Sequence, residues 1–163
     1  LDRVEGTWIV IALIWCLIMF AMMVGWHVWG KQNLSTETYK TTPEKFTLKA
    51  QAMVDKYTVR TETAEKIPVV APPPGSDVYL VARLWNFWPI LELEKGKSYR
   101  LHLTSMDYNH GFSLQPVNIN IQIVPGYEHV VNITPNQSGT YSVVCNEFCG
   151  INHHTMVSRI YVK

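Results

Sequence analysis

YRLHLT at residues 99–104 and INIQIV at residues 119–124 are the stretches that decide the fold class. In both, apolar side chains alternate with polar ones, and a period of two is typical of a strand that buries one face. Further short apolar runs follow at 141–144 and 157–162, with turn-forming residues between the runs. Several short strands without a helical pattern between them predict an antiparallel β sandwich or barrel over residues 77–163.

The N-terminal stretch TWIVIALIWCLIMFAMMVGWHVW, residues 7–29, contains no Asp, Glu, Lys or Arg. It exceeds the roughly 20 residues that a helix needs to cross a bilayer. A cleaved signal peptide is the alternative, but signal cores run about 7 to 15 residues and end at small-residue cleavage sites. Residues 1–31 are therefore expected to form one transmembrane anchor helix. Arg3 and Lys31 flank the stretch, so the positive-inside rule leaves its orientation undecided.

Between the anchor and the strands, residues 32–76 are expected to form a spacer with one short helix. Thr42-Pro-Glu44 is a helix-start signal. Helical spacing then relates the apolar residues Phe46, Ala50, Met53, Val54 and Tyr57. This amphipathic helix near residues 43–57 would lie on the membrane surface, on a partner subunit or on its own domain, and the sequence does not choose among these. The run AEKIPVVAPPPGSD, residues 64–77, predicts an extended, semi-rigid linker.

Length and composition exclude several classes of protein. A chain of 163 residues with 47% apolar content can build one modest domain with one appended element. The net charge is +1 and Lys and Arg do not cluster, so the electrostatic footprint of a nucleic-acid-binding protein is missing from the sequence. No nucleic-acid partner is expected. Three cysteines are too few for a disulfide framework.

The densest chemistry lies in the stretch CNEFCGINHHTM, residues 145–156, between the last two predicted strands. Thiolate and thioether are soft ligands, and a weak Met beside Cys and His marks electron-transfer copper sites. Two thiolates can bridge a pair of copper ions, which leaves one imidazole for each metal. The second imidazole must come from elsewhere, and His110 in DYNHGF, residues 107–112, is the best candidate. His102 and His129 fall in strand-like runs with no ligand partners nearby in sequence.

Two other arrangements use the same residues. Cys145 and Cys149 could form a disulfide in an oxidising compartment. With His110 and His153 they could instead form a tetrahedral zinc site. The spacing excludes neither arrangement, but neither of them accounts for Met156.

The pattern of His110 followed by C-x3-C-x3-H-x2-M, with the anchor and the β domain, resembles subunit II of the haem-copper oxidases, which carries the dinuclear CuA centre. The single anchor helix and the stretches at 107–112 and 118–121 look most like the B-type branch. The resemblance implies an all-β, cupredoxin-like Greek-key sandwich at 77–163 with one N-terminal transmembrane helix. Residues 1–31 would be the anchor and 32–76 the spacer.

By the same resemblance, the chain would bind two copper ions. The implied ligands are His110, Cys145, the backbone carbonyl of Glu147, Cys149, His153 and Met156. The two sulfurs would bridge the metals, each histidine would bind one metal, and the thioether and the carbonyl would be weak axial ligands. Asp107 matches a carboxylate just before the first histidine of the family, where it would support the ligands from behind. Ordinary loop capping is the alternative role for Asp107.

Other residues receive roles only from the resemblance. Trp85, Phe87 and Trp88 occupy the region where family members place aromatic side chains near the surface that receives electrons, although core packing is expected for at least one of them. Glu5 resembles a glutamate that helps proton uptake at the start of the B-type anchor helix, with a helix-flanking charge as the alternative. The stretch RLWNFWP, residues 83–89, departs from the family members, as does the amphipathic segment.

The implied function is electron transfer in a respiratory oxidase. Cytochrome c or a similar small carrier would reduce the copper pair, which would pass electrons to haem in a larger catalytic membrane subunit. The β domain would lie on the outer, periplasmic or extracellular side of the cell membrane, held by a single pass. The alternatives are the copper subunit of a nitric oxide reductase of the same superfamily, and a structural subunit stabilised by zinc or a disulfide without a redox role.

Overall fold

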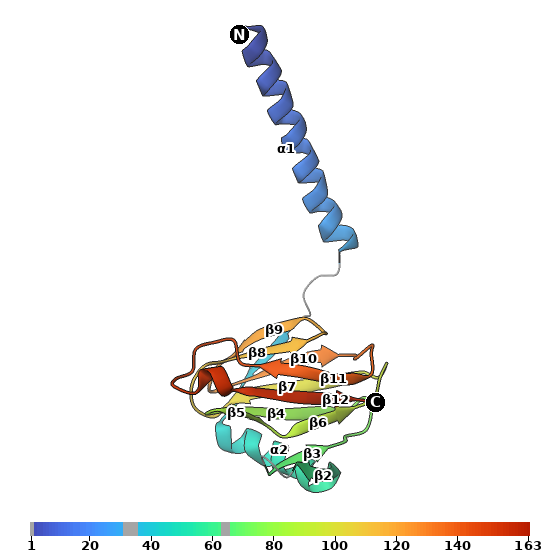
Figure 1. Ribbon diagram of the computed structural model, residues 1–163, viewed down its shortest axis with the longest axis vertical. Helices are drawn as coiled ribbons and strands as arrows, with labels where there is room; N and C mark the ends of the chain where they lie inside the picture. The colour runs from blue at the N-terminus through green and yellow to red at the C-terminus, as the bar shows by residue number, and fades with distance from the viewer. Residues whose placement is uncertain (1, 31–35, 63–65) are drawn as a thin grey trace. The chain divides into compact units, whose positions relative to one another are not determined.

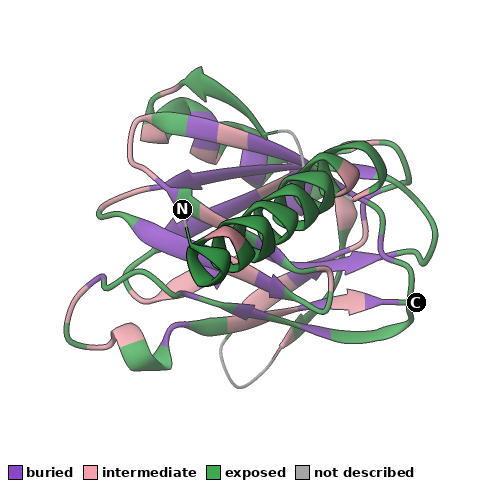
Figure 2. Cartoon of the chain, turned by 90° about the horizontal axis from the view of Figure 1, so that it is seen from above, coloured by how far each residue is buried: buried purple, intermediate pink, exposed green. Residues whose placement is uncertain are grey.

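The computed structural model describes residues 2–30, 36–62 and 66–163, and the chain divides into two units at residues 33 and 34 (Figure 1). The first unit is the helix α1 (Arg3–Trp29), which has no buried residue (Figure 2). It is long and apolar enough to cross a membrane. It begins four residues before the predicted apolar stretch, because Asp2 and Glu5 form a capping box in which each side chain accepts a hydrogen bond from the backbone of the other.

The second unit is a two-sheet sandwich with one covering helix, α2 (Pro43–Tyr57), and one short 3-10 turn, η1 (His153–Thr155). The described strands of the first sheet, in spatial order, are β1 (Thr36–Lys40), β10 (Tyr127–Ile133), β7 (Tyr99–Ser105), β4 (Asp77–Arg83) and β5 (Asn86–Trp88). Those of the second are β2 (Thr58–Glu62), β3 (Ile67–Val70), β6 (Ile90–Leu93), β12 (Val157–Val162), β11 (Gly139–Val144), β8 (His110–Gln115) and β9 (Ile119–Ile123). The predicted sandwich is confirmed.

The pairing is not purely antiparallel, which corrects the expectation from the sequence. The pairs β4–β7, β3–β6 and β6–β12 are parallel. In each pair the chain leaves the sheet between the two strands and returns in the same direction, which a hairpin cannot do. The main core lies between the sheets and includes Leu101 and Leu103 from β7, with Phe112 and Val143 from β8 and β11.

The helix α2 has the predicted bounds and packs on its own domain, which decides among the three expected locations. Phe46 and Ala50 are fully buried and form one cluster with Val81 of β4. This helix explains why β7 is not half-buried as predicted. Leu101 and its alternate neighbours face the core, but His102 is also buried, on the side of the sheet that α2 covers.

The described part of residues 32–76, which was expected to be a spacer, belongs to the β domain. β1 pairs with β10, and β3 pairs with both β2 and β6. Val69 and Val70 are fully buried, so these apolar residues decide the local structure rather than the prolines that follow them. The division of the chain therefore lies near residue 33 and not at residue 76. Residues 31–35 and 63–65 lie outside the described residues.

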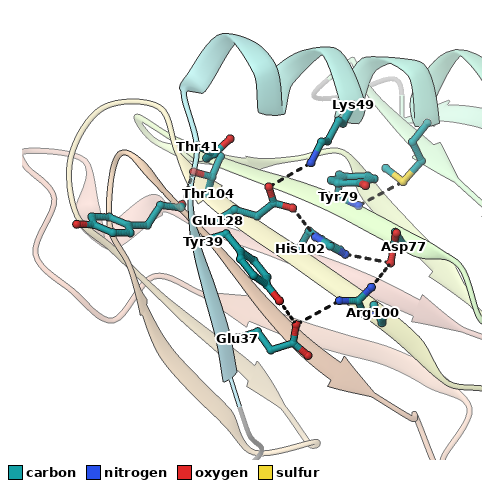
Figure 3. A network of polar contacts seen from close by, with 12 residues as sticks. Glu37, Tyr39, Thr41, Lys49, Asp77, Tyr79, Arg100, His102, Thr104 and Glu128 are labelled. Carbon is teal, nitrogen blue, oxygen red and sulfur yellow. Dashed lines mark hydrogen bonds and ion pairs between the residues drawn. The ribbon is translucent and has the colours of Figure 1, made fainter.

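A group of charged and polar side chains, the outer-face network, joins α2 to the first sheet and links the edge strand β1 to its neighbours (Figure 3). Its members are Glu37, Tyr39, Lys49, Asp77, Arg100, His102 and Glu128. At its centre His102 Nδ1 lies 2.5 Å from Glu128 Oε1, and both side chains are buried. His102 Nε2 lies 3.1 Å from Asp77 Oδ1 but is not aligned for a hydrogen bond. Lys49 Nζ lies 3.3 Å from the second oxygen of Glu128.

Candidate metal centre

Two cysteines, two histidines and a methionine meet around the loop that joins β11 to β12. The sulfurs of Cys145 and Cys149 lie 3.7 Å apart. His110 Nδ1 lies 3.8 Å from the Cys145 sulfur, and His153 Nδ1 lies 3.6 Å from the Cys149 sulfur. Met156 Sδ lies 3.7 Å from the Cys149 sulfur. The structure therefore brings together all five side chains that the sequence singled out.

Strand pairing explains how residues far apart in sequence reach this loop. β8 pairs with β11, so His110 at the start of β8 lies beside Cys145 at the end of β11. The loop is closed by a backbone hydrogen bond of 3.1 Å from Cys145 N to Met156 O. The Glu147 carbonyl oxygen turns back to within 3.2 Å of the Cys145 sulfur. A backbone oxygen thus joins the soft donors at this point.

Four of the five side chains in the cluster are buried, His153 is partly buried, and the two thiols are not joined. His110 and Met156 are fully buried, and Cys145 and Cys149 are 3% and 5% exposed. A disulfide needs sulfurs about 2.05 Å apart, so the 3.7 Å separation excludes one here. Burial, together with the neighbouring Cys145, raises the pKa of the Cys149 thiol to about 11. Two thiolates side by side therefore need a cation between them, which suits this donor set to a metal.

Asp107 orients the buried histidine. Its Oδ1 accepts a 2.7 Å hydrogen bond from His110 Nε2, and its Oδ2 accepts a 2.8 Å bond from the backbone of Leu84. Burial alone would raise the pKa of the Asp107 carboxyl, but these hydrogen bonds and one from the Tyr108 backbone outweigh burial and hold that pKa below its usual range. With the proton on Nε2, the lone pair of His110 Nδ1 faces Cys145, as a metal ligand requires.

Comparison with known proteins identifies the family. Residues 89–162 match the family model described as cytochrome c oxidase subunit II, periplasmic domain. Cytochrome c oxidase subunit 2 of Thermus thermophilus is 34% identical over 115 residues, which cover 68% of this chain and 85% of the relative. This chain belongs to the cytochrome c oxidase subunit 2 family. It is a subunit of a haem-copper oxidase, and its buried cysteines, histidine and methionine are the donor set of a copper site.

Solved structures agree with this identification of the subunit. A chain of a haem-copper terminal oxidase dimer aligns with a TM-score of 0.60 and 25% identity over 99% of this chain and 100% of its own length. The periplasmic domain of subunit II from Bradyrhizobium japonicum aligns with a TM-score of 0.51 and 18% identity, over 56% of this chain and 86% of its own. A rusticyanin aligns with a TM-score of 0.50 and 19% identity, over 81% of this chain and 100% of its own length. The last two show the fold alone, a cupredoxin-like sandwich.

The three aromatic residues predicted near the electron-receiving surface of the subunit separate in the structure. Trp85 lines an open hollow of about 810 Å³ that reaches Cys149. Phe87 is fully buried in the core, and Trp88 is partly buried and packs against the cluster formed by Phe46 and its neighbours under α2. Only Trp85 of the three lies beside the copper site. Its indole nitrogen is buried and has no hydrogen-bond partner among the described residues.

Sequence reasoning missed three residues of this site. Gly111 on β8 lies directly under the ligand loop, and Asn146 in that loop is hydrogen-bonded to Asn120 on β9. One signal was present, because a glycine inside a strand often marks the close approach of another backbone segment. Nothing in the sequence pairs two asparagines that lie 26 positions apart.

Proposed function

We propose that this subunit receives electrons at a dinuclear copper centre and passes them to haem in the catalytic subunit of its oxidase. The order of contacts supports the proposal: each histidine touches a different sulfur, and the two sulfurs touch each other. In the described part of the chain, only His110, Cys145 and Cys149 form a cluster with every donor atom within 4.8 Å of the others. A single tetrahedral zinc would need His153 in the same cluster.

The proposed ligands follow from the same contacts. Cys145 and Cys149 would bridge the two metals, and His110 and His153 would bind one each. The Glu147 carbonyl contacts the sulfur of Cys145, and the Met156 thioether contacts the sulfur of Cys149. Both would be weak ligands. Bound there, copper would supply one-electron redox chemistry. The protein's contribution is to hold the donors between β8 and a loop that is tied to the sandwich by strand pairing, so that little rearrangement accompanies electron transfer.

An apolar surface beside the sulfurs supports a protein electron donor. Phe148 and Ile151, on the ligand loop, are 79% and 85% exposed, and Tyr108 is 62% exposed. Together with Trp85 they line the hollow that reaches Cys149. Large exposed apolar side chains in one patch mark an interaction surface. We propose that cytochrome c or a similar small carrier docks here, with Trp85 and Phe148 as aromatic contacts beside the centre.

The helix α1 supports a membrane location for this function. The length and composition of α1 support a single pass through the cell membrane. The match to a family model described as a periplasmic domain supports a copper-binding domain on the outer side. Glu5 takes part in the capping box of α1, which gives its carboxylate a structural role. The proton-uptake role of Glu5 and the assignment to the B-type branch stay predictions.

Metal analysis of the whole chain in detergent tests the proposal. After reconstitution with copper we expect two copper ions per chain and a paramagnetic resonance spectrum in which one unpaired electron couples to both copper nuclei. One zinc ion, or one copper ion with a single-copper spectrum, would contradict it. The reduced oxidase complex should consume oxygen and not nitric oxide, which separates an oxidase from a nitric oxide reductase.

A further inference from the structure

The ligand loop rests on bare backbone at Gly111. A Cβ on Gly111 would lie 2.0 Å from Asn146 Oδ1, and 2.7 and 2.8 Å from the backbone nitrogens of Glu147 and Asn146. Gly111 also follows His110 directly in β8. In β8, His110 therefore supplies an imidazole to the metal centre, and the next residue, Gly111, gives the ligand loop room to approach the strand backbone.

A side-chain hydrogen bond holds the loop against Gly111. Asn146 Nδ2 donates to Asn120 Oδ1 at 2.8 Å, so the Asn146 side chain reaches from the loop, across Gly111, to β9. Among the described residues, this is the one side-chain hydrogen bond made by the three loop residues 146–148. Asn120 and Asn146 are both exposed. An exposed amide pair contributes little to folding, so stability does not explain why the two side chains are joined.

The bond acts on the backbone oxygen of the metal centre. Asn146 stands between Cys145 and Glu147, and the Glu147 carbonyl lies 3.2 Å from the Cys145 sulfur. Each residue contributes two soft dihedral angles to a loop, so fixing Asn146 at both its backbone and its side chain limits where that carbonyl points. We infer that Asn120, Asn146 and Gly111 are positioning residues that set the distance of the Glu147 carbonyl from the metal centre. The inference rests on the proposed copper centre.

Three variants of the full chain in detergent, reconstituted with copper, test the inference: Asn120→Ala, Asn146→Ala and the double variant. Each single variant should change the visible and paramagnetic resonance spectra and the reduction potential. It should also release copper to a chelator about tenfold faster, the usual scale for losing a group that orients a ligand. The double variant should match the single variants, because both remove the same bond. The melting temperature of the metal-free chain should stay within about 5 °C of wild type.

Gln122→Ala is the matched control. Gln122 lies on the same strand as Asn120, is also exposed and lies opposite Gly111, but its side chain has no hydrogen-bond partner among the described residues. This variant should keep the wild-type spectra, potential and release rate. Asn120→Asp keeps an oxygen acceptor for Asn146 and should restore slow copper release.

The outcomes separate this inference from the proposed function. If Asn120→Ala behaves like Gln122→Ala in spectra, potential and release rate while wild type binds two copper ions, the positioning role is wrong and the copper centre stands. Additive effects in the double variant would also overturn it, because the two asparagines would then act separately. A wild-type chain that does not bind two copper ions would overturn both proposals.

Discussion

Two buried histidines of this subunit each contact a carboxylate, yet only one of them faces the metal centre. His110 Nε2 lies 2.7 Å from Asp107, and His102 Nδ1 lies 2.5 Å from Glu128. The second nitrogen of His110 faces the sulfur of Cys145, whereas the second nitrogen of His102 faces another carboxylate (Figure 3). A carboxylate orients the ring in both places. What distinguishes a metal ligand is that its other nitrogen is left facing soft donors.

The largest expected difference between the two regions comes from Cys149→Ser. This change removes one of the two proposed bridging sulfurs, so the dinuclear spectrum should disappear and the copper content should fall below two per chain. His102→Ala, which removes the other buried histidine, should leave both unchanged. Copper analysis with paramagnetic resonance checks the pair of variants. A dinuclear spectrum that persists in Cys149→Ser would show that Cys149 is not a bridging ligand.

Glu128→Ala should have the opposite pattern of effects from Cys149→Ser. It should lower the free energy of unfolding and leave the metal centre unchanged. It removes the carboxylate that contacts both the buried Nδ1 of His102 and the half-exposed ammonium group of Lys49. Leaving a buried polar group without its hydrogen-bond partner costs about 2 kcal/mol. Denaturant unfolding of the chain should show this loss while the copper spectrum stays the same. Glu37→Ala, at an exposed position of the outer-face network, should cost less than about 1 kcal/mol. Equal losses in the two variants would contradict this view of the network.

Alkaline pH should destabilise the metal-free chain through its buried thiol pair. The pKa of the Cys149 thiol is raised by burial from 9.0 to about 11 in the folded protein, so folding favours the protonated thiol. The free energy of unfolding should therefore be intact below pH 9 and fall as the pH rises from 9 to 11, by on the order of 2 kcal/mol. Metal-free Cys149→Ser should lack this component. Identical pH profiles for the two proteins would refute the prediction.

Of the changes at the metal centre, Asp107→Asn has the smallest expected effect. The variant keeps the shape of the side chain but weakens the charged hydrogen bond that orients His110. Copper affinity should fall about tenfold, measured by competition with a chelator, with an unchanged fold by circular dichroism. Asp77→Asn makes the same change beside His102 and should leave copper affinity as it is. Equal copper affinities in Asp107→Asn and wild type would assign the carboxylate to loop capping alone.

Local features of this subunit were predictable from its sequence. The period of two located β7 and β9, and the helix-start signal at Thr42 with its apolar stripe gave the bounds of α2. The spacing of residues 145–156 placed four of the five ligand side chains in one loop, because that loop joins two neighbouring strands. Such features depend on residues close in sequence, which is why pattern alone suffices.

The remainder depends on contacts between distant segments. The sequence did not show that β1 would pair with β10 or β3 with β6, which brings the described part of residues 32–76 into the domain. The burial of His102 follows from the placement of α2, and that of Phe87 from its position between the sheets. The contact of Gly111 with Asn146 requires β8 and the ligand loop to meet first. No local sequence pattern predicts these contacts.

The place of β12 in its sheet has a consequence for the timing of synthesis. β12 lies between β6 and β11 in space, and it follows both of them in the chain. Until residues 157–162 have left the ribosome, none of the described strands joins these two halves of the sheet, and the loop that ends at Met156 has no second strand to close it. The loop of the metal site is therefore completed only after α1 and the other described strands have been translated, and we expect copper to be inserted late in the biogenesis of this subunit.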